Sequence, residues 1–96
     1  MAEEKKVKEI QINFPQDKQA GAYANNMVVA HSKEEFILDF MLVTPPTGVV
    51  NARIIMSPGH VKRVIAALAS NMRHYEEQFG KIEEATEPKN PFGFQA

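Results

Sequence analysis

One long amphipathic helix is the feature that most limits what this chain can fold into. The stretch from Arg53 to Gly80 reads RIIMSPGHVKRVIAALASNMRHYEEQFG, a short apolar strand that runs directly into a helical pattern. Ser57 is a good N-cap, Pro58 suits the first helical position, and Gly80 is typical of a helix end. We therefore predict a single continuous helix over residues 58–79.

Apolar side chains follow one face of this helix at alternating steps of four and three residues. At about 1.5 Å of rise per residue they form a stripe roughly 30 Å long. We expect the stripe to be buried, with Leu68 near its centre. Its members are Val61, Ile65, Leu68, Met72, Tyr75 and Phe79, followed by Ile82.

The composition is that of one small globular domain. The chain has 96 residues, of which 44% are hydrophobic and 24% charged, and its net charge of −1 gives no global basic field for nucleic acid. It contains no cysteine, which excludes disulfides and thiolate zinc sites. No apolar run reaches the ~20 residues that cross a bilayer, and the start resembles no secretory signal. We expect a cytoplasmic protein.

Four strand-like segments precede the helix. The first alternates, with Ile10, Ile12 and Phe14 on one face. A polar turn at residues 32–35 joins the second and third segments as a hairpin. Thr44-Pro45-Pro46-Thr47-Gly48 breaks the chain before the fourth. The four segments are residues 7–14, 22–31, 36–43 and 49–56.

The order β-β-β-β-α predicts an α+β fold, in which a four-stranded antiparallel meander carries the C-terminal helix across one face. The other face would expose Ile37, Met41 and Val43, or their counterparts, and an exposed apolar face usually marks an interface. We therefore expect a homodimer, formed through the open sheet face or through paired helices.

The expected domain covers residues 7–82. Residues 1–6 are predicted to be a flexible N-terminus, and residues 83–96 a disordered tail. The tail contains Phe92 and Phe94, which either dock on another chain or have no such role.

Several short motifs link this chain to a known family. They are Tyr23-Ala24-Asn25, Glu35-Phe36, Leu38-Asp39-Phe40, Arg53-Ile54, Ser57-Pro58, His60, Lys62-Arg63, Tyr75-Glu76 and Phe79-Gly80. With these motifs, residues 21–82 resemble the bacterial domain of unknown function numbered 3467. The resemblance implies no activity, because the family's biochemistry is itself unassigned. In topology alone, the predicted fold is also similar to the Whirly, Pur-type and positive-cofactor-four single-strand nucleic-acid binders, but fold similarity does not establish function.

Basic side chains gather at the predicted start of the helix. His60, Lys62 and Arg63 lie in its first turns, where positive charge opposes the helix dipole. Either they reach solvent or a partner's carboxylate, or they help to bind an anion or a nucleic-acid backbone. For the second alternative the candidate residues are Arg53, His60, Lys62, Arg63, Arg73 and Tyr23.

Other polar residues have a structural interpretation beside a functional one. Asp39 lies in an apolar strand, where it either pairs with Arg53 across the strands or acts as a catalytic acid with a raised pKa. Tyr23, Asn25 and Asn26 indicate a β-bulge or a stacking surface for single-stranded bases.

Neither catalysis nor a bound cofactor is predicted. Ser57 could serve as a nucleophile beside His60, but helix capping accounts for it. The histidines show no metal-ligand spacing. We expect a non-enzymatic binding or assembly module without metal, cofactor, membrane or small-molecule substrate. The alternative is single-stranded nucleic-acid or anion binding through the basic helix start.

Overall fold

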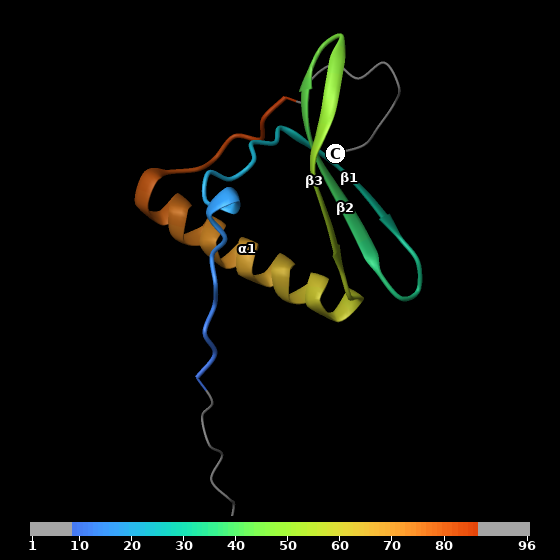
Figure 1. Cartoon of the computed structure of the whole chain (residues 1–96). Helices are drawn as coiled ribbons and strands as arrows, with labels where there is room; N and C mark the ends of the chain where they lie inside the picture. Colours follow the sequence, from blue (N-terminus) through green and yellow to red (C-terminus); the bar gives the residue numbers. More distant parts are fainter. Residues whose placement is uncertain (1–8, 87–96) are drawn as a thin grey trace, which may run out of the picture.

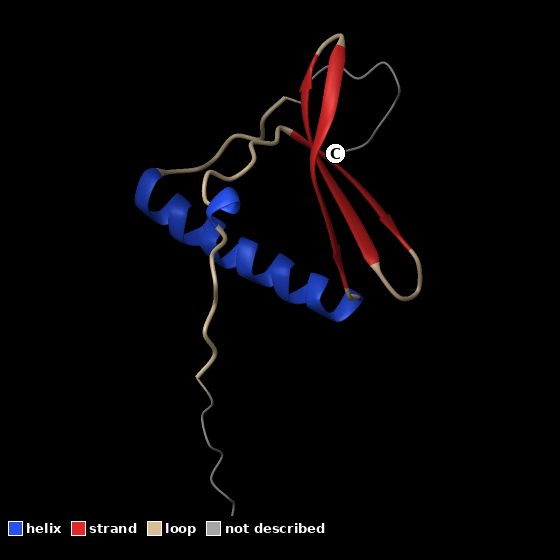
Figure 2. Ribbon diagram, viewed as in Figure 1, coloured by secondary structure: helices blue, strands red, loops and turns tan. Residues whose placement is uncertain are grey.

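The computed structural model describes residues 9–86, in which three antiparallel strands are followed by one long helix (Figures 1 and 2). The strands form a single sheet in the order β1-β2-β3. This confirms the α+β class and the C-terminal helix, but with three strands in place of four. The elements are η1 (Gln16–Lys18), β1 (Asn26–His31), β2 (Phe36–Thr44), β3 (Thr47–Met56) and α1 (Pro58–Phe79).

The predicted hairpin between β1 and β2 is closed by a serine turn. The Ser32 hydroxyl accepts hydrogen bonds from the backbone N–H groups of Glu34 and Glu35, each at 3.2 Å. The Ser32 N–H donates to the Glu35 carbonyl oxygen at 2.9 Å. His31 and Phe36 are paired across the strands, and their rings stack with centroids 5.2 Å apart. Backbone and side chains thus fix the same register.

The second hairpin turns tightly at the two prolines, where Thr44 pairs with Thr47. Its ladder contains one irregularity: Phe40 pairs with Ala52 but Met41 pairs with Val50. The extra residue, on β3, forms a β-bulge that locally strengthens the twist of the strand. The β1–β2 register is continuous from Asn26 to His31, so the β-bulge that was one interpretation of Tyr23, Asn25 and Asn26 is not found within β1.

Asn25 lies directly before β1, and its side chain extends the hydrogen-bond ladder between β1 and β2. Its Oδ1 accepts the Val43 N–H at 2.8 Å, and its Nδ2 donates to the Val43 carbonyl oxygen at 3.0 Å. The Asn25 backbone N–H donates to the carbonyl oxygen of Met41 at 3.0 Å. The side chain thus replaces a backbone pair, and β1 begins at Asn26 rather than at residue 22.

The first predicted strand is wrong in its described part, residues 9–14, because this segment pairs with no strand of the described chain. Ile10, Ile12 and Phe14 are between 64 and 85% exposed. A segment of alternating apolar and polar residues forms a β-strand only where another strand pairs with it. Here the turn at Pro15 leads residues 9–14 away from the sheet (Figure 1). Residues 7 and 8 lie outside the described residues.

The helix has the predicted bounds and the predicted caps. Ser57 accepts a hydrogen bond from the His60 N–H to its side-chain oxygen at 3.2 Å. Gly80 has φ 99°, and its N–H donates to the Glu76 carbonyl oxygen at 2.9 Å. A side chain is disfavoured at that φ, which explains the glycine.

The placement of the helix differs from the prediction. α1 leaves the end of β3 and diverges from the sheet, so that the two form a V (Figure 1), and no strand packs extensively against it. Ile65, Leu68 and Phe79 are 61, 65 and 66% exposed, so the predicted burial of the stripe is wrong within one chain. A single residue, Ser57, connects β3 to α1, and from this junction the helix does not pack back onto the sheet.

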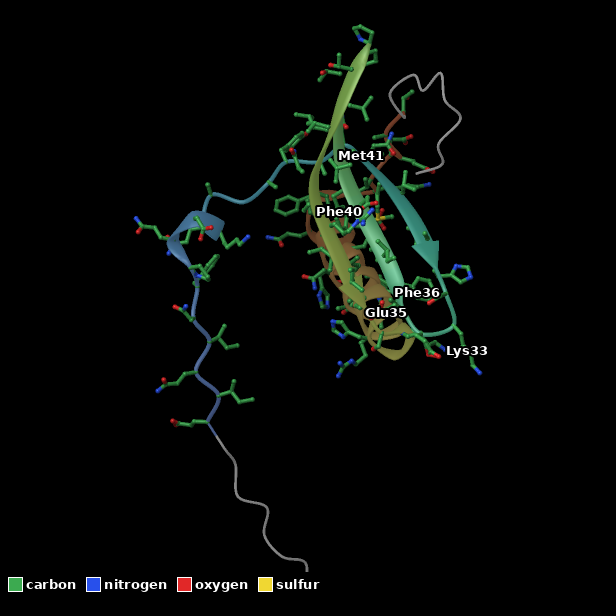
Figure 3. The ribbon with its side chains drawn as sticks, turned by 45° about the vertical axis from the view of Figure 1, so that its right-hand side comes forward. Lys33, Glu35, Phe36, Phe40 and Met41 are labelled. Atoms are coloured by element: carbon green, nitrogen blue, oxygen red, sulfur yellow. The ribbon has the colours of Figure 1, made fainter. Side chains whose placement is uncertain are left out.

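The best-covered part of the sheet is β2, its central strand. Met41 is 8% exposed, and Ile37 and Val43 are partly buried, so the expected exposure of these three side chains is wrong. Figure 3 shows Phe36, Phe40 and Met41 along β2, with α1 behind the sheet in that view. No helix within residues 9–86 combines the length and apolar character needed to cross a membrane.

The chain ends, for which flexible segments were predicted, lie largely outside the described residues. This applies to residues 1–6 and to Phe92 and Phe94 of the predicted tail. Residues 83–86 follow the helix without regular structure.

Candidate interaction site

The predicted cross-strand ion pair is present. Asp39 and Arg53 are register partners on β2 and β3. Arg53 donates from Nε to Oδ1 of Asp39 at 2.7 Å and from Nη2 to Oδ2 at 2.9 Å. The Asp39 side chain is 20% exposed and that of Arg53 61%. The two hydrogen bonds make this a bidentate arginine–carboxylate pair. The pair explains why an acidic residue lies in an apolar strand.

The ion pair also sets the charge state of both groups. Hydrogen bonding from Arg53 lowers the pKa of Asp39; desolvation opposes this shift, and the positive charge of Arg53 adds to it. The hydrogen bonds to Asp39, with its negative charge, raise the pKa of Arg53. Asp39 therefore does not have the raised pKa that the catalytic-acid alternative requires.

The start of α1 brings two of the predicted basic residues together. Nη2 of Arg63 lies 3.0 Å from Nδ1 of His60. Because arginine can only donate, Nδ1 is the acceptor in this contact. Lys62 is exposed on another side of the same turn. The first turn of α1 contains no acidic residue.

The six candidate residues for nucleic-acid binding are not gathered at one point. Arg53 is held by Asp39. Arg73 lies ten residues beyond Arg63, about 15 Å along the helix. Tyr23 is exposed elsewhere, where its carbonyl oxygen accepts a hydrogen bond from Asn51 Nδ2 at 2.7 Å.

A shallow open cleft of about 410 Å³ lies near Asn51, between β3 and the segment that contains η1. Lys18, Ala22 and Ile54 are among its lining residues. The described residues include no group of three or more histidine, aspartate or glutamate side chains that could hold a metal ion.

The surface carries many exposed apolar side chains. The stripe of α1 lies open along nearly its whole length, with Ile65, Leu68, Met72, Tyr75 and Phe79 all exposed. Further exposed apolar side chains lie on β3 and in residues 9–14. They are Val49, Val50, Ile54, Ile55, Ile10, Ile12 and Phe14.

Sequence reasoning missed the structural roles of three polar residues. Asn25 extends the ladder, Asn51 anchors the segment before β1, and Glu76 accepts the Ile82 N–H at Oε2 at 2.9 Å. An asparagine directly before a strand signals the first role, because its side chain can imitate a backbone amide. The hydrogen bond of Asn51 depends on tertiary structure, and that of Glu76 depends on the chain reversal after Gly80.

Together, these observations define a small α+β chain that carries an internal ion pair and an uncovered apolar helix face. The chain belongs to the family described as a protein of unknown function (DUF3467), whose family model matches residues 1–84. The resemblance inferred from the motifs is thereby confirmed. No curated protein and no solved structure matches the chain. The topological likeness to single-strand nucleic-acid binders therefore receives no support from these comparisons.

Proposed function

We propose that this chain is a small non-enzymatic assembly module that works as a homodimer. One observation carries the proposal: the stripe of α1 is formed as an apolar face but remains exposed within the single chain. Burying apolar surface stabilises a protein by about 25 cal/mol per Å². A second copy presents the same stripe and can supply the missing cover.

The size of the exposed surface supports this proposal. Tyr75 and Phe79 belong to a residue class that can bury about 150–250 Å² each. The aliphatic part of the stripe and the open side chains of β3 add to this area. A stable interface takes about 800 Å² from each partner. An apolar face that runs nearly the whole length of a helix is of the kind that forms such an interface.

A pair of matched variants tests the proposal. Leu68→Glu places a charge in the stripe, whereas Ala66→Glu places the same charge about 160° away around the helix. Both positions are exposed in the single chain, so neither substitution disturbs a buried side chain of the monomer. We expect Leu68→Glu to give monomer and Ala66→Glu to remain dimeric in light scattering after size exclusion. Equal masses for the two variants would contradict an interface on the stripe.

The second candidate is single-stranded nucleic-acid or anion binding at the start of α1. The contact between His60 and Arg63 and the absence of an acidic residue in the first turn favour it. We rank it below assembly, because Arg53 is paired and the net charge is −1.

Fluorescence polarisation with a short labelled oligonucleotide at two salt concentrations tests this second candidate. Replacing Lys62 and Arg63 with glutamine should lower the affinity and flatten the salt dependence by about one to two units. Arg63→Gln alone should give an intermediate result. No binding by the wild type at low salt would remove this candidate.

A further inference from the structure

The spacing of the stripe is that of a helix which packs against one other helix. From Val61 to Phe79 the residues of the stripe alternate between steps of four and three, a seven-residue repeat. Such a narrow repeat is typical of the seam between paired helices. Resting on the homodimer proposed above, we infer that α1 pairs antiparallel with α1 of a second copy, with Lys62 of each chain beside Glu76 of the other.

The shape of the stripe favours the antiparallel direction. Its C-terminal end is aromatic, with the rings of Tyr75 and Phe79 4.9 Å apart, whereas its N-terminal half is aliphatic. An antiparallel pair sets the wide end of one helix against the narrow end of the other, so the two axes keep an even distance. The facing pairs are then Val61 with Phe79, Ile65 with Tyr75, and Leu68 with Met72.

Charge complementarity gives an independent argument. Lys62, Ala69 and Glu76 recur every seven residues along one flank of the stripe. A two-fold axis at the middle of an antiparallel pair places this flank of one helix against the same flank of the other helix, so that each contact occurs twice. Ala69 then meets Ala69 of the second copy at the axis. Lys62 meets Glu76 on either side of it.

The same arrangement explains why these charges oppose their own helix dipole. Lys62 lies near the positive N-terminal end of α1, and Glu76 lies near its negative C-terminal end. In an antiparallel pair, each charge lies beside the opposite end of the neighbouring helix, where its sign is favourable. Glu76 is also held in place at the helix end, because its Oε2 accepts the Ile82 N–H.

A parallel pair would gain none of these contacts. The two aromatic ends would meet each other, and the two aliphatic ends would lie opposite one another. Across the flanks, Asn71 would face Glu76 and Val64 would face Ala69, which leaves Lys62 without an acidic partner in the pair. The aligned helix dipoles would also repel.

Site-specific cross-linking tests the direction, because the chain contains no native cysteine. Lys62→Cys and Glu76→Cys proteins, mixed and treated with a short bis-maleimide, should give a cross-linked heterodimer. Val61→Cys alone should not cross-link, since its two copies lie about 27 Å apart along an antiparallel pair. In a parallel pair they would face each other, and Val61→Cys would cross-link readily.

Charge reversal tests the proposed contact itself. Lys62→Glu sets two carboxylates opposite each other at both symmetric positions, and Glu76→Lys sets two ammonium groups opposite each other. Each should weaken dimerisation about ten-fold. The double variant Lys62→Glu/Glu76→Lys restores opposite charges and should recover most of that loss. Failure of the double variant to recover would overturn the pairing of these two residues.

The outcomes separate this inference from the homodimer on which it rests. A wild-type protein that stays monomeric contradicts both. A wild-type dimer in which Val61→Cys cross-links, while the mixture of Lys62→Cys and Glu76→Cys does not, contradicts only the antiparallel arrangement. A dimer with the reverse pattern, together with recovery in the double variant, supports it.

Discussion

Asp39 on β2 and Arg53 on β3 face each other directly across the sheet and share two hydrogen bonds, of 2.7 and 2.9 Å. This pair lies near the centre of the longer hairpin, among side chains that are mostly apolar. It fixes the β2–β3 register, because a shift by one residue would move the two groups to opposite faces.

The ion pair should make stability depend on pH in the acid range. In the unfolded chain an aspartate has a pKa of about 3.9, and in the folded protein the pKa of Asp39 is lower. On acidification the unfolded chain takes up its proton first, so stability is lost as pH falls through the folded pKa. We expect wild type to exceed Asp39→Asn in stability by a constant amount above about pH 5.

Urea denaturation between acid and neutral pH measures this difference. It should shrink as the pH falls below about 4. Arg53→Gln should show the same loss, because it removes the other half of the pair. A difference between wild type and Asp39→Asn that grows on acidification would contradict the account.

The side-chain ladder at Asn25 should be measurable as stability. Asn25→Ala removes both hydrogen bonds to the Val43 backbone, each worth about 0.5–1.5 kcal/mol. Asn25→Asp keeps an acceptor for the Val43 N–H but loses the donor, so its loss should be smaller at neutral pH. Chemical denaturation gives both values, and an unchanged midpoint for Asn25→Ala would show that the ladder ends at β1.

The N-cap of α1 gives a prediction with an internal control. Ser57→Ala removes the acceptor for the His60 N–H and should cost about 0.5–2 kcal/mol. Ser70→Ala, in the middle of the helix, should be neutral or slightly stabilising because alanine is the better helix former. If the two variants have equal thermal midpoints, Ser57 is not a cap.

The sequence was sufficient for the elements whose signals are local. Ser57, Pro58 and Gly80 gave the bounds of the helix, and Asp39 and Arg53 gave a cross-strand contact because each was unusual for its position. Local signals failed where a neighbour was needed. Residues 9–14 alternate like a strand but have no ladder partner in the described chain.

The stripe of α1 shows the same limit. Its periodicity indicates which face is apolar, but it does not say whether a sheet of the same chain or another helix covers that face. The charges of the candidate basic residues do not say whether these side chains lie together, and Arg73 lies about 15 Å along the helix from Arg63. Tertiary geometry decides both questions.

If the stripe is covered by a second copy, stability should depend on protein concentration. Binding between folded chains stabilises them by mass action, so the denaturation midpoint should rise as concentration increases. Leu68→Ala should cost about 2–5 kcal/mol when measured on the dimer. A loss below about half a kcal/mol would mean that Leu68 remains uncovered in solution, as it is in the single chain.

Sedimentation equilibrium of the wild-type chain tests the central claim most directly. We expect a mass of about twice the 10.8 kDa of the single chain at micromolar concentration, because two exposed stripes cover each other. Dilution should convert this species to monomer in a single step. A mass of 10.8 kDa that persists up to millimolar concentration would contradict the account.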